Sequence, residues 1–217
     1  MTVDDEVATN AALTGPDERF ADRLAVRVSS EALQRRLVAQ ETAHLAATLP
    51  AVADSGSVVR AAALVVAARR RYVTGTAKSF GYATLLAGDL AVGLSHVTLV
   101  GAATAPVLDV LPEVRATDVL VAYSLRRYRR ETVVFAEQFV AAGGVLVAVT
   151  DAPTAPLARI AAETVVVDTG SASYADSPTA VVAVSHVLAT LVAASAKGAR
   201  RRIAARDRLS RDLGLYL

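Results

Sequence analysis

Five short apolar runs, spaced about 25 residues apart after Arg70, constrain the fold more than any other feature of the sequence. The runs are RYVTG (71–75), HVTLV (96–100), DVLVAYS (118–124), VLVAVT (145–150) and TVVVD (164–168). Most of them are continuously apolar instead of alternating, a pattern typical of strands that are covered on both faces. The sequence between and after them is helical, at 77–92, 130–142, 155–162 and 177–206. The pattern therefore predicts a five-stranded parallel α/β unit with right-handed crossovers.

The sequence before these runs is helical. Residues 1–16 are expected to form a flexible leader, which ends at a Gly-Pro turn signal. Leucines then recur at mostly fourfold spacing between Glu18 and Leu49, with Ser29 and Ser30 as candidate caps. PAVADSGS (50–57) breaks this pattern, and a second helix is predicted at 58–70. We accordingly divide the chain into the leader, a helical extension at 17–56 and an α/β domain at 57–217.

Composition excludes several classes of protein. An apolar content of 53% with 20% charged residues excludes a disordered chain. The longest weakly charged stretch, Ser177 to Ser195, contains a histidine and several hydroxyls, so it predicts a core helix and not a membrane span. The N-terminus is acidic and polar, unlike a secretory signal, and the chain has no cysteine. We expect a cytoplasmic protein without contact to a membrane.

The loops that follow the first and third apolar runs carry the candidate binding residues. In open parallel sheets, ligands bind beyond the carboxyl ends of the strands, near helix N-termini. The loops there are GTAKS (75–79) and SLRRYRRE (124–131), which are rich in hydroxyls, glycine and arginine. Such loops suit an anion held by backbone N–H groups, hydroxyls and guanidinium groups.

An arginine cluster lies in the second of these loops. Arg126, Arg127, Arg129 and Arg130 crowd the N-terminus of the helix predicted at 130–142. The helix macrodipole disfavours cations at that end, and a bound anion would remove the penalty. A nucleic-acid surface is not favoured, because the net charge of the whole chain is only +2. We interpret the cluster as an anion site, with one or two of its members simply solvated.

The remaining polar residues give weaker signals. His44 and His186 lie on predicted helices and His96 begins a strand, so we interpret all three as packed or surface residues. No group of His, Asp and Glu has the spacing of metal ligands, and neither a Walker A loop nor a GxGxxG motif is present. We expect no metal and no cofactor.

This succession of loops resembles the SIS (sugar isomerase) domain of the MurR/RpiR family of bacterial regulators. The resemblance covers about residues 60–200 and is carried by RRRYVTGTAKSFGYATLLAGDL, S-x-R-R-Y-x-R-E-T and AVTD-x-x-x-x-PLA. It implies a three-layer α/β fold with the flavodoxin-like strand order. It also implies a phosphosugar ligand and assembly into a homodimer or homotetramer.

The two family loops are altered in this chain. The usual GxGxS reads Gly75-Thr76-Ala77-Lys78-Ser79, and the usual S-x-S-G-x-T-x-E keeps only its first serine and its glutamate. The resemblance implies phosphate ligands at Ser79 and Ser124, whereas at Arg126 and Arg129 only the position carries over. We expect Gly75, Thr76, Lys78 and Arg127 to complete the ligand-binding set. Arginine could still hold a phosphate with two hydrogen bonds.

Two functions follow as hypotheses from the resemblance. The first is a sensor that binds a phosphosugar, or a related anionic metabolite, without catalysis. The family's regulators carry an N-terminal helix-turn-helix domain, and the extension at 17–56 resembles only the tail of one, so DNA binding is not expected. The alternative is a sugar-phosphate aldose–ketose isomerase or a repurposed enzyme of the same fold, for which Glu131 and His186 are the weak candidates for a catalytic pair.

Overall fold

A computed structural model describes residues 15–24, 29–101 and 103–216. The helices are α2 (Pro16–Leu24), α3 (Ser30–Ser55), α4 (Ser57–Ala67), α5 (Lys78–Gly93), α6 (Val107–Val110), α7 (Arg130–Ala141), α8 (Thr179–Ser195) and α9 (Ala199–Asp212). The strands are β1 (Arg71–Gly75), β2 (Val97–Val100), β3 (Val119–Tyr123), β4 (Val145–Thr150) and β5 (Glu163–Val166), with short 3-10 turns at Leu111–Glu113 and Pro156–Arg159. The leader at 1–16 lies outside the described residues, apart from Gly15 and Pro16.

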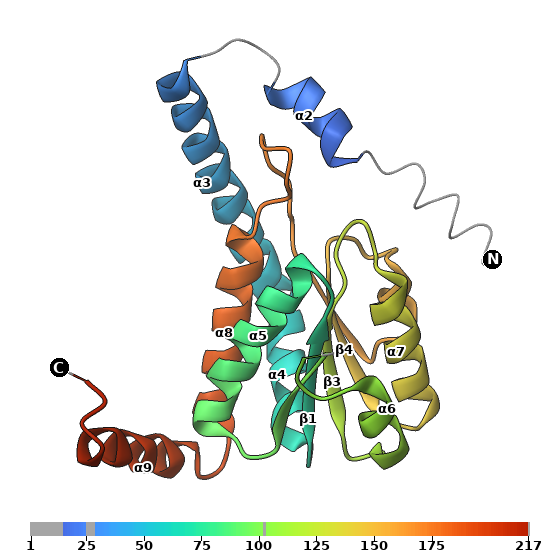
Figure 1. Cartoon of the computed structure of the whole chain (residues 1–217), viewed down its shortest axis with the longest axis vertical. Helices are drawn as coiled ribbons and strands as arrows, with labels where there is room; N and C mark the ends of the chain where they lie inside the picture. The colour runs from blue at the N-terminus through green and yellow to red at the C-terminus, as the bar shows by residue number, and fades with distance from the viewer. Residues whose placement is uncertain (1–14, 25–28, 102, 217) are drawn as a thin grey trace.

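The five strands form one parallel sheet in the order β2-β1-β3-β4-β5. This confirms the predicted parallel α/β architecture and its flavodoxin-like strand order. Helices cover both faces of the sheet: α4, α5 and α8 lie on one side, and α6 and α7 lie on the other (Figure 1). The structure therefore has the expected three layers.

Strand β3 explains why the apolar runs are continuous. Its residues alternate between the two hydrophobic cores, with Val121 and Tyr123 in the core under α4, α5 and α8. Leu120 and Ala122 belong to the core under α6 and α7. Every residue of this strand is buried, so each position is filled by an apolar side chain.

The helical segment predicted between Glu18 and Leu49 differs from the observed structure. Helix α3 begins after Ser29, whose side chain accepts a hydrogen bond from the Ala32 amide at 3.2 Å. It runs through Pro50, where the sequence predicted a break, and ends at Gly56 with a φ of 66°. Proline removes one helical hydrogen bond, but the turns around it bury Thr48 and Val52, and this packing outweighs the local preference.

Three other segments also differ from the predictions. The long helix predicted at 177–206 is divided into α8 and α9, because Ala196 adopts an extended conformation. Gly198, just before α9, has a φ of 81°, in the left-handed region that glycine favours. Only a 3-10 turn forms within 155–162. Helix α6 was not predicted, since four residues are too few to show a helical period.

No single helix in the described ranges combines the length and apolar character of a membrane span. Two pairs of consecutive helices meet those criteria together, α3 with α4 and α8 with α9, but they bend by 62° and 104°.

Arg71, the first residue of β1, is a buried cation that is held by backbone carbonyls. Its guanidinium donates to the carbonyls of Val65, Val66, Arg69 and Ser95 at 2.9–3.3 Å. Burial, and then the charge of Arg202, lower the pKa of Arg71. The side chain thus joins the C-terminus of α4 to the start of the sheet, where the helix dipole favours a positive charge.

Replacing Arg71 with Met is expected to reduce the free energy of unfolding by roughly 2–4 kcal/mol, because several buried carbonyls would lose their partner. Urea denaturation of the purified variant measures this loss. The matched control is Arg69→Met, two residues earlier at an exposed side chain, which should change stability by less than about 0.5 kcal/mol. Equal effects of the two changes would contradict a structural role for Arg71.

Candidate ligand-binding site

The site predicted from the sequence lies where the strand order reverses. Strands β1 and β3 are neighbours, but α5 leaves β1 toward one face of the sheet and α7 leaves β3 toward the other (Figure 1). The loops after the two strands meet at this point, where a hydrogen bond of 2.6 Å joins the hydroxyls of Thr76 and Thr132. Open α/β sheets bind their ligands at such a switch point.

The loop after β1 has a tight backbone. A Cβ atom on Gly75 would lie 2.5 Å from the Ser79 carbonyl oxygen, so only glycine fits there. Ala77 has a φ of 53° and a ψ of −123°, a conformation that side-chain-bearing residues rarely adopt. The family pattern places a glycine at this position, and the chain keeps the glycine conformation although it carries alanine.

The change Ala77→Gly is expected to stabilise the protein by about 1 kcal/mol, because it relieves backbone strain at this position. Chemical denaturation measures the difference. The control is Ala47→Gly, at an exposed site within α3, which should destabilise by about 1 kcal/mol. The expected effects have opposite signs, so a loss of stability with Ala77→Gly would show that position 77 is unstrained.

Ser124 follows β3 directly and is fixed by the neighbouring strand. Its amide donates to the Val149 carbonyl at 3.0 Å, and its own carbonyl accepts from the Thr150 hydroxyl at 2.8 Å. The residue is 3% exposed, and its Oγ has no hydrogen-bond partner among the described residues. A buried hydroxyl without a partner is costly unless a ligand or water satisfies it.

The arginines of the loop after β3 differ in their surroundings. Arg126 donates to the Asp151 carboxylate at 3.1 Å, and the Asp151 side chain is only 2% exposed, so this charge is already neutralised. Arg127, Arg129 and Arg130 are exposed, and the described part of the chain provides no ion-pair partner for them. These three remain available to an anion at the start of α7.

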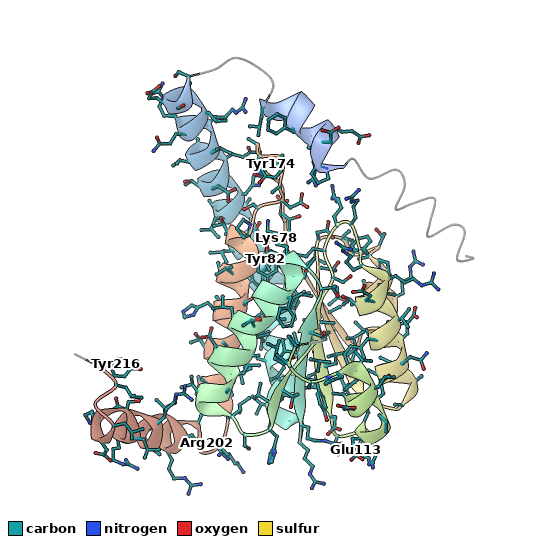
Figure 2. All side chains as sticks on the ribbon, viewed as in Figure 1. Lys78, Tyr82, Glu113, Tyr174, Arg202 and Tyr216 are labelled. Carbon is teal, nitrogen blue, oxygen red and sulfur yellow. The ribbon has the colours of Figure 1, made fainter. Side chains whose placement is uncertain are left out.

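Lys78 contacts the loop before α8, which also contacts the N-terminal helix α2. Its ammonium donates to the Asp176 carbonyl, and the Asp176 carboxylate accepts from the Arg19 guanidinium of α2. Partial burial lowers the pKa of Lys78, which the Asp176 charge opposes. The rings of Phe20 and Tyr174 also meet, at a centroid distance of 6.4 Å, and Figure 2 shows Tyr174 above Lys78.

Helix α3 holds the same loop from its other side. The His44 ring donates from Nδ1 to the Gly170 carbonyl at 2.8 Å, and the Ser177 hydroxyl donates to the Glu41 carboxylate. His44 is therefore a packed residue, as the sequence analysis interpreted it. These contacts join residues more than 120 positions apart, so no local pattern in the sequence could have indicated them.

The change Asp176→Asn is expected to weaken the attachment of α2 to the rest of the protein. It removes the ion pair with Arg19 and leaves a mostly buried guanidinium without its charge partner. Hydrogen–deuterium exchange should rise severalfold over residues 16–24 while exchange in β3 is unchanged. Asp54→Asn, at an exposed position of α3, is the control and should alter neither. Unchanged exchange in α2 would contradict the anchoring role of Asp176.

The two candidate catalytic residues are not brought together. Glu131 lies in the first turn of α7, whereas His186 is exposed on α8, on the opposite face of the sheet (Figure 1). They cannot form an acid–base pair within one subunit. His96 precedes β2, where its carbonyl accepts from the Arg71 amide at 2.9 Å, which agrees with the interpretation of a structural residue.

A cavity of about 600 Å³ adjoins the two loops. We call it the apolar chamber, and its walls include Phe80, Val100, Pro106, Val107 and Phe135. It shares Gly75, Thr76 and Glu131 with the sequence-predicted residues, whereas Lys78, Ser79, Ser124 and the arginines lie outside its lining. The structure thus places a polar, cationic rim beside an apolar cavity.

Comparison with known proteins identifies the domain. The family model of the SIS domain matches residues 64–196. No curated protein matches the chain. Among solved structures, the sugar isomerase domain of an RpiR transcription factor from Sphaerobacter thermophilus superposes with a TM-score of 0.71 at 24% identity, covering 81% of this chain and 98% of that chain.

Two more distant structures share the fold. The Vibrio vulnificus NanR protein, solved in complex with ManNAc-6P, has a TM-score of 0.66 at 16% identity, covering 81% of this chain and 69% of that chain. The C-terminal domain of a glucosamine-fructose-6-phosphate aminotransferase from Francisella tularensis has a TM-score of 0.52 at 16% identity, covering 70% and 42%. Regulators and enzymes thus both occur on this architecture.

Proposed function

The chain belongs to the SIS domain family, and on this premise we propose that it binds a phosphorylated sugar, or a related anionic metabolite, as a noncatalytic sensor. The observation that carries this proposal is the junction of the loops after β1 and β3. Within the described residues, the buried Ser124 hydroxyl has no hydrogen-bond partner there, and the three exposed arginines at positions 127–130 have no ion-pair partner. One of the structural neighbours, NanR, was solved with a sugar phosphate bound.

The charges at the rim support an anionic ligand. Arg127, Arg129 and Arg130 stand at the N-terminus of α7, where the helix dipole adds to their positive potential. A phosphate there would accept charge-assisted hydrogen bonds from guanidinium groups and from backbone amides, which are stronger than neutral ones. In this proposal Arg126 stabilises the loop through its ion pair with Asp151, and Arg127 and Arg129 contact the ligand.

The geometry supports sensing better than isomerisation. An aldose–ketose isomerase needs an acid and a base near adjacent carbons of the substrate. Glu131 and His186 lie on opposite sides of the sheet, so the one pair found in the sequence is not assembled within one subunit. We further propose that the protein is a cytoplasmic homodimer or homotetramer of bacterial origin, and that DNA binding is not part of its activity.

A panel of sugar phosphates is expected to contain at least one that raises the melting temperature of the protein and binds in calorimetry. Arg127→Gln should weaken that binding about tenfold or more, because it removes a charged hydrogen-bond donor. It should leave the melting temperature of the free protein unchanged, since Arg127 is exposed.

The matched control is Arg35→Gln, an exposed arginine on α3, which should bind as the wild type does. If neither a sugar phosphate nor a related anionic metabolite binds the wild-type protein, the proposed function is wrong. Interconversion of an aldose phosphate and its ketose phosphate by the wild type would instead establish an isomerase.

A further inference from the structure

The apolar chamber lies between α5, α7 and the segment that starts α6. Phe80 enters from α5, Phe135 from α7, and Pro106 and Val107 from the segment that starts α6. Gly101 permits this arrangement, because a Cβ atom there would lie 2.6 Å from Cε2 of Phe80. The volume of about 600 Å³ falls within the range of roughly 300–1,000 Å³ that ligand pockets occupy.

The polar groups of the lining are mostly engaged already. Thr74 donates its hydroxyl to the Val100 carbonyl at 3.1 Å, and the hydroxyls of Thr76 and Thr132 bond to one another at 2.6 Å. Glu131 is the one charged residue among the described residues of the lining. A bare sugar ring inside the chamber would therefore bury hydroxyls against a wall that offers them few partners, which is unfavourable.

The chamber shares part of its wall with the proposed phosphate site. Gly75, Thr76 and Ala77 form part of its lining and also belong to the loop after β1, while Glu131 and Thr132 lie in the first turn of α7. A ligand whose phosphate is held at the rim is thus within reach of the chamber. The part of it that enters must be apolar if it is to replace the water there favourably.

We propose that the apolar chamber is a specificity subsite for an apolar substituent on the phosphorylated ligand. This inference rests on the proposed binding of a sugar phosphate and narrows its chemical class. The ligand is a sugar phosphate that carries an acyl or alkyl group of several carbon atoms, and not an unsubstituted one. Glu131, at the mouth, accepts a hydrogen bond from an O–H or N–H group near the point where the substituent is attached.

A chain-length series tests this inference. The probes are glucosamine 6-phosphate, its N-acetyl, N-butanoyl and N-hexanoyl derivatives, and the methyl, butyl and hexyl glycosides of glucose 6-phosphate. Calorimetry is expected to show an affinity that rises by up to about fourfold for each added methylene group in at least one series, as burial of an alkyl chain requires. Affinity that stays constant or falls with chain length in both series would overturn the inference.

A variant that fills the apolar chamber tests whether the gain in affinity with chain length arises there. Val107→Phe adds bulk to the chamber wall and should abolish the gain with chain length while the shortest probe still binds. Leu108→Phe is the matched control, because Leu108 is 81% exposed on the same short helix, and this variant should keep the gain. If Val107→Phe does not fold, Ala103→Phe blocks the same chamber from its exposed loop.

The outcomes separate the two proposals. If none of these probes, no other sugar phosphate and no related anionic metabolite binds, the proposed function fails and the inference fails with it. If the unsubstituted sugar phosphates bind and the substituents add nothing, the function stands and the inference alone is wrong. A chain-length gain that persists unchanged in both blocking variants would also contradict it, because the substituent would then lie elsewhere.

Discussion

The departure of α5 and α7 toward opposite faces of the sheet is the constraint on which the candidate site depends. Their parent strands are adjacent and in register, with Gly75 beside Tyr123, so the loops that follow start at the same level. Because the helices then diverge, neither one covers the space between the loops. The Thr76–Thr132 hydrogen bond spans that space and ties the two loops together. The packing of the two helices on opposite faces of the sheet thus opens the space between the loops, and the polar contact only fixes how the loops lie relative to each other.

The N-terminal helices make a second set of contacts near the candidate site. Helices α2 and α3 both bind the loop between β5 and α8, through Arg19 and Asp176 on one side and His44 and Gly170 on the other. That loop also receives the ammonium of Lys78. Lys78, a candidate ligand residue, therefore shares Asp176 as a partner with Arg19 of the N-terminal extension. The three charged groups interact, so a change at any one of them alters the other two.

The sequence predicted the sheet well because its central strands are buried on both faces, and such strands appear in the sequence as continuous apolar runs. It predicted helix ends less well, because Pro50 and Gly198 act through packing and backbone freedom that a periodic pattern does not reveal. The sequence predicted which positions form the candidate site, but not which residues they contact. Asp151 and Asp176 neutralise arginines far away in the chain, and only the folded arrangement brings Glu131 and His186 to opposite faces.

The altered loops keep the backbone of the family pattern while they change its side chains. Ala77 retains a glycine conformation, and a Cβ atom on Gly75 would clash with the Ser79 carbonyl. Strain of this kind persists only where the surrounding structure fixes the backbone, so the backbone shape of the loop survives the substitution. In the other loop, Arg126 is held by Asp151, which keeps an arginine-rich segment folded near the helix dipole. In the proposed function, backbone shape thus fixes where the ligand binds, while the arginines and the apolar chamber determine which ligand it is.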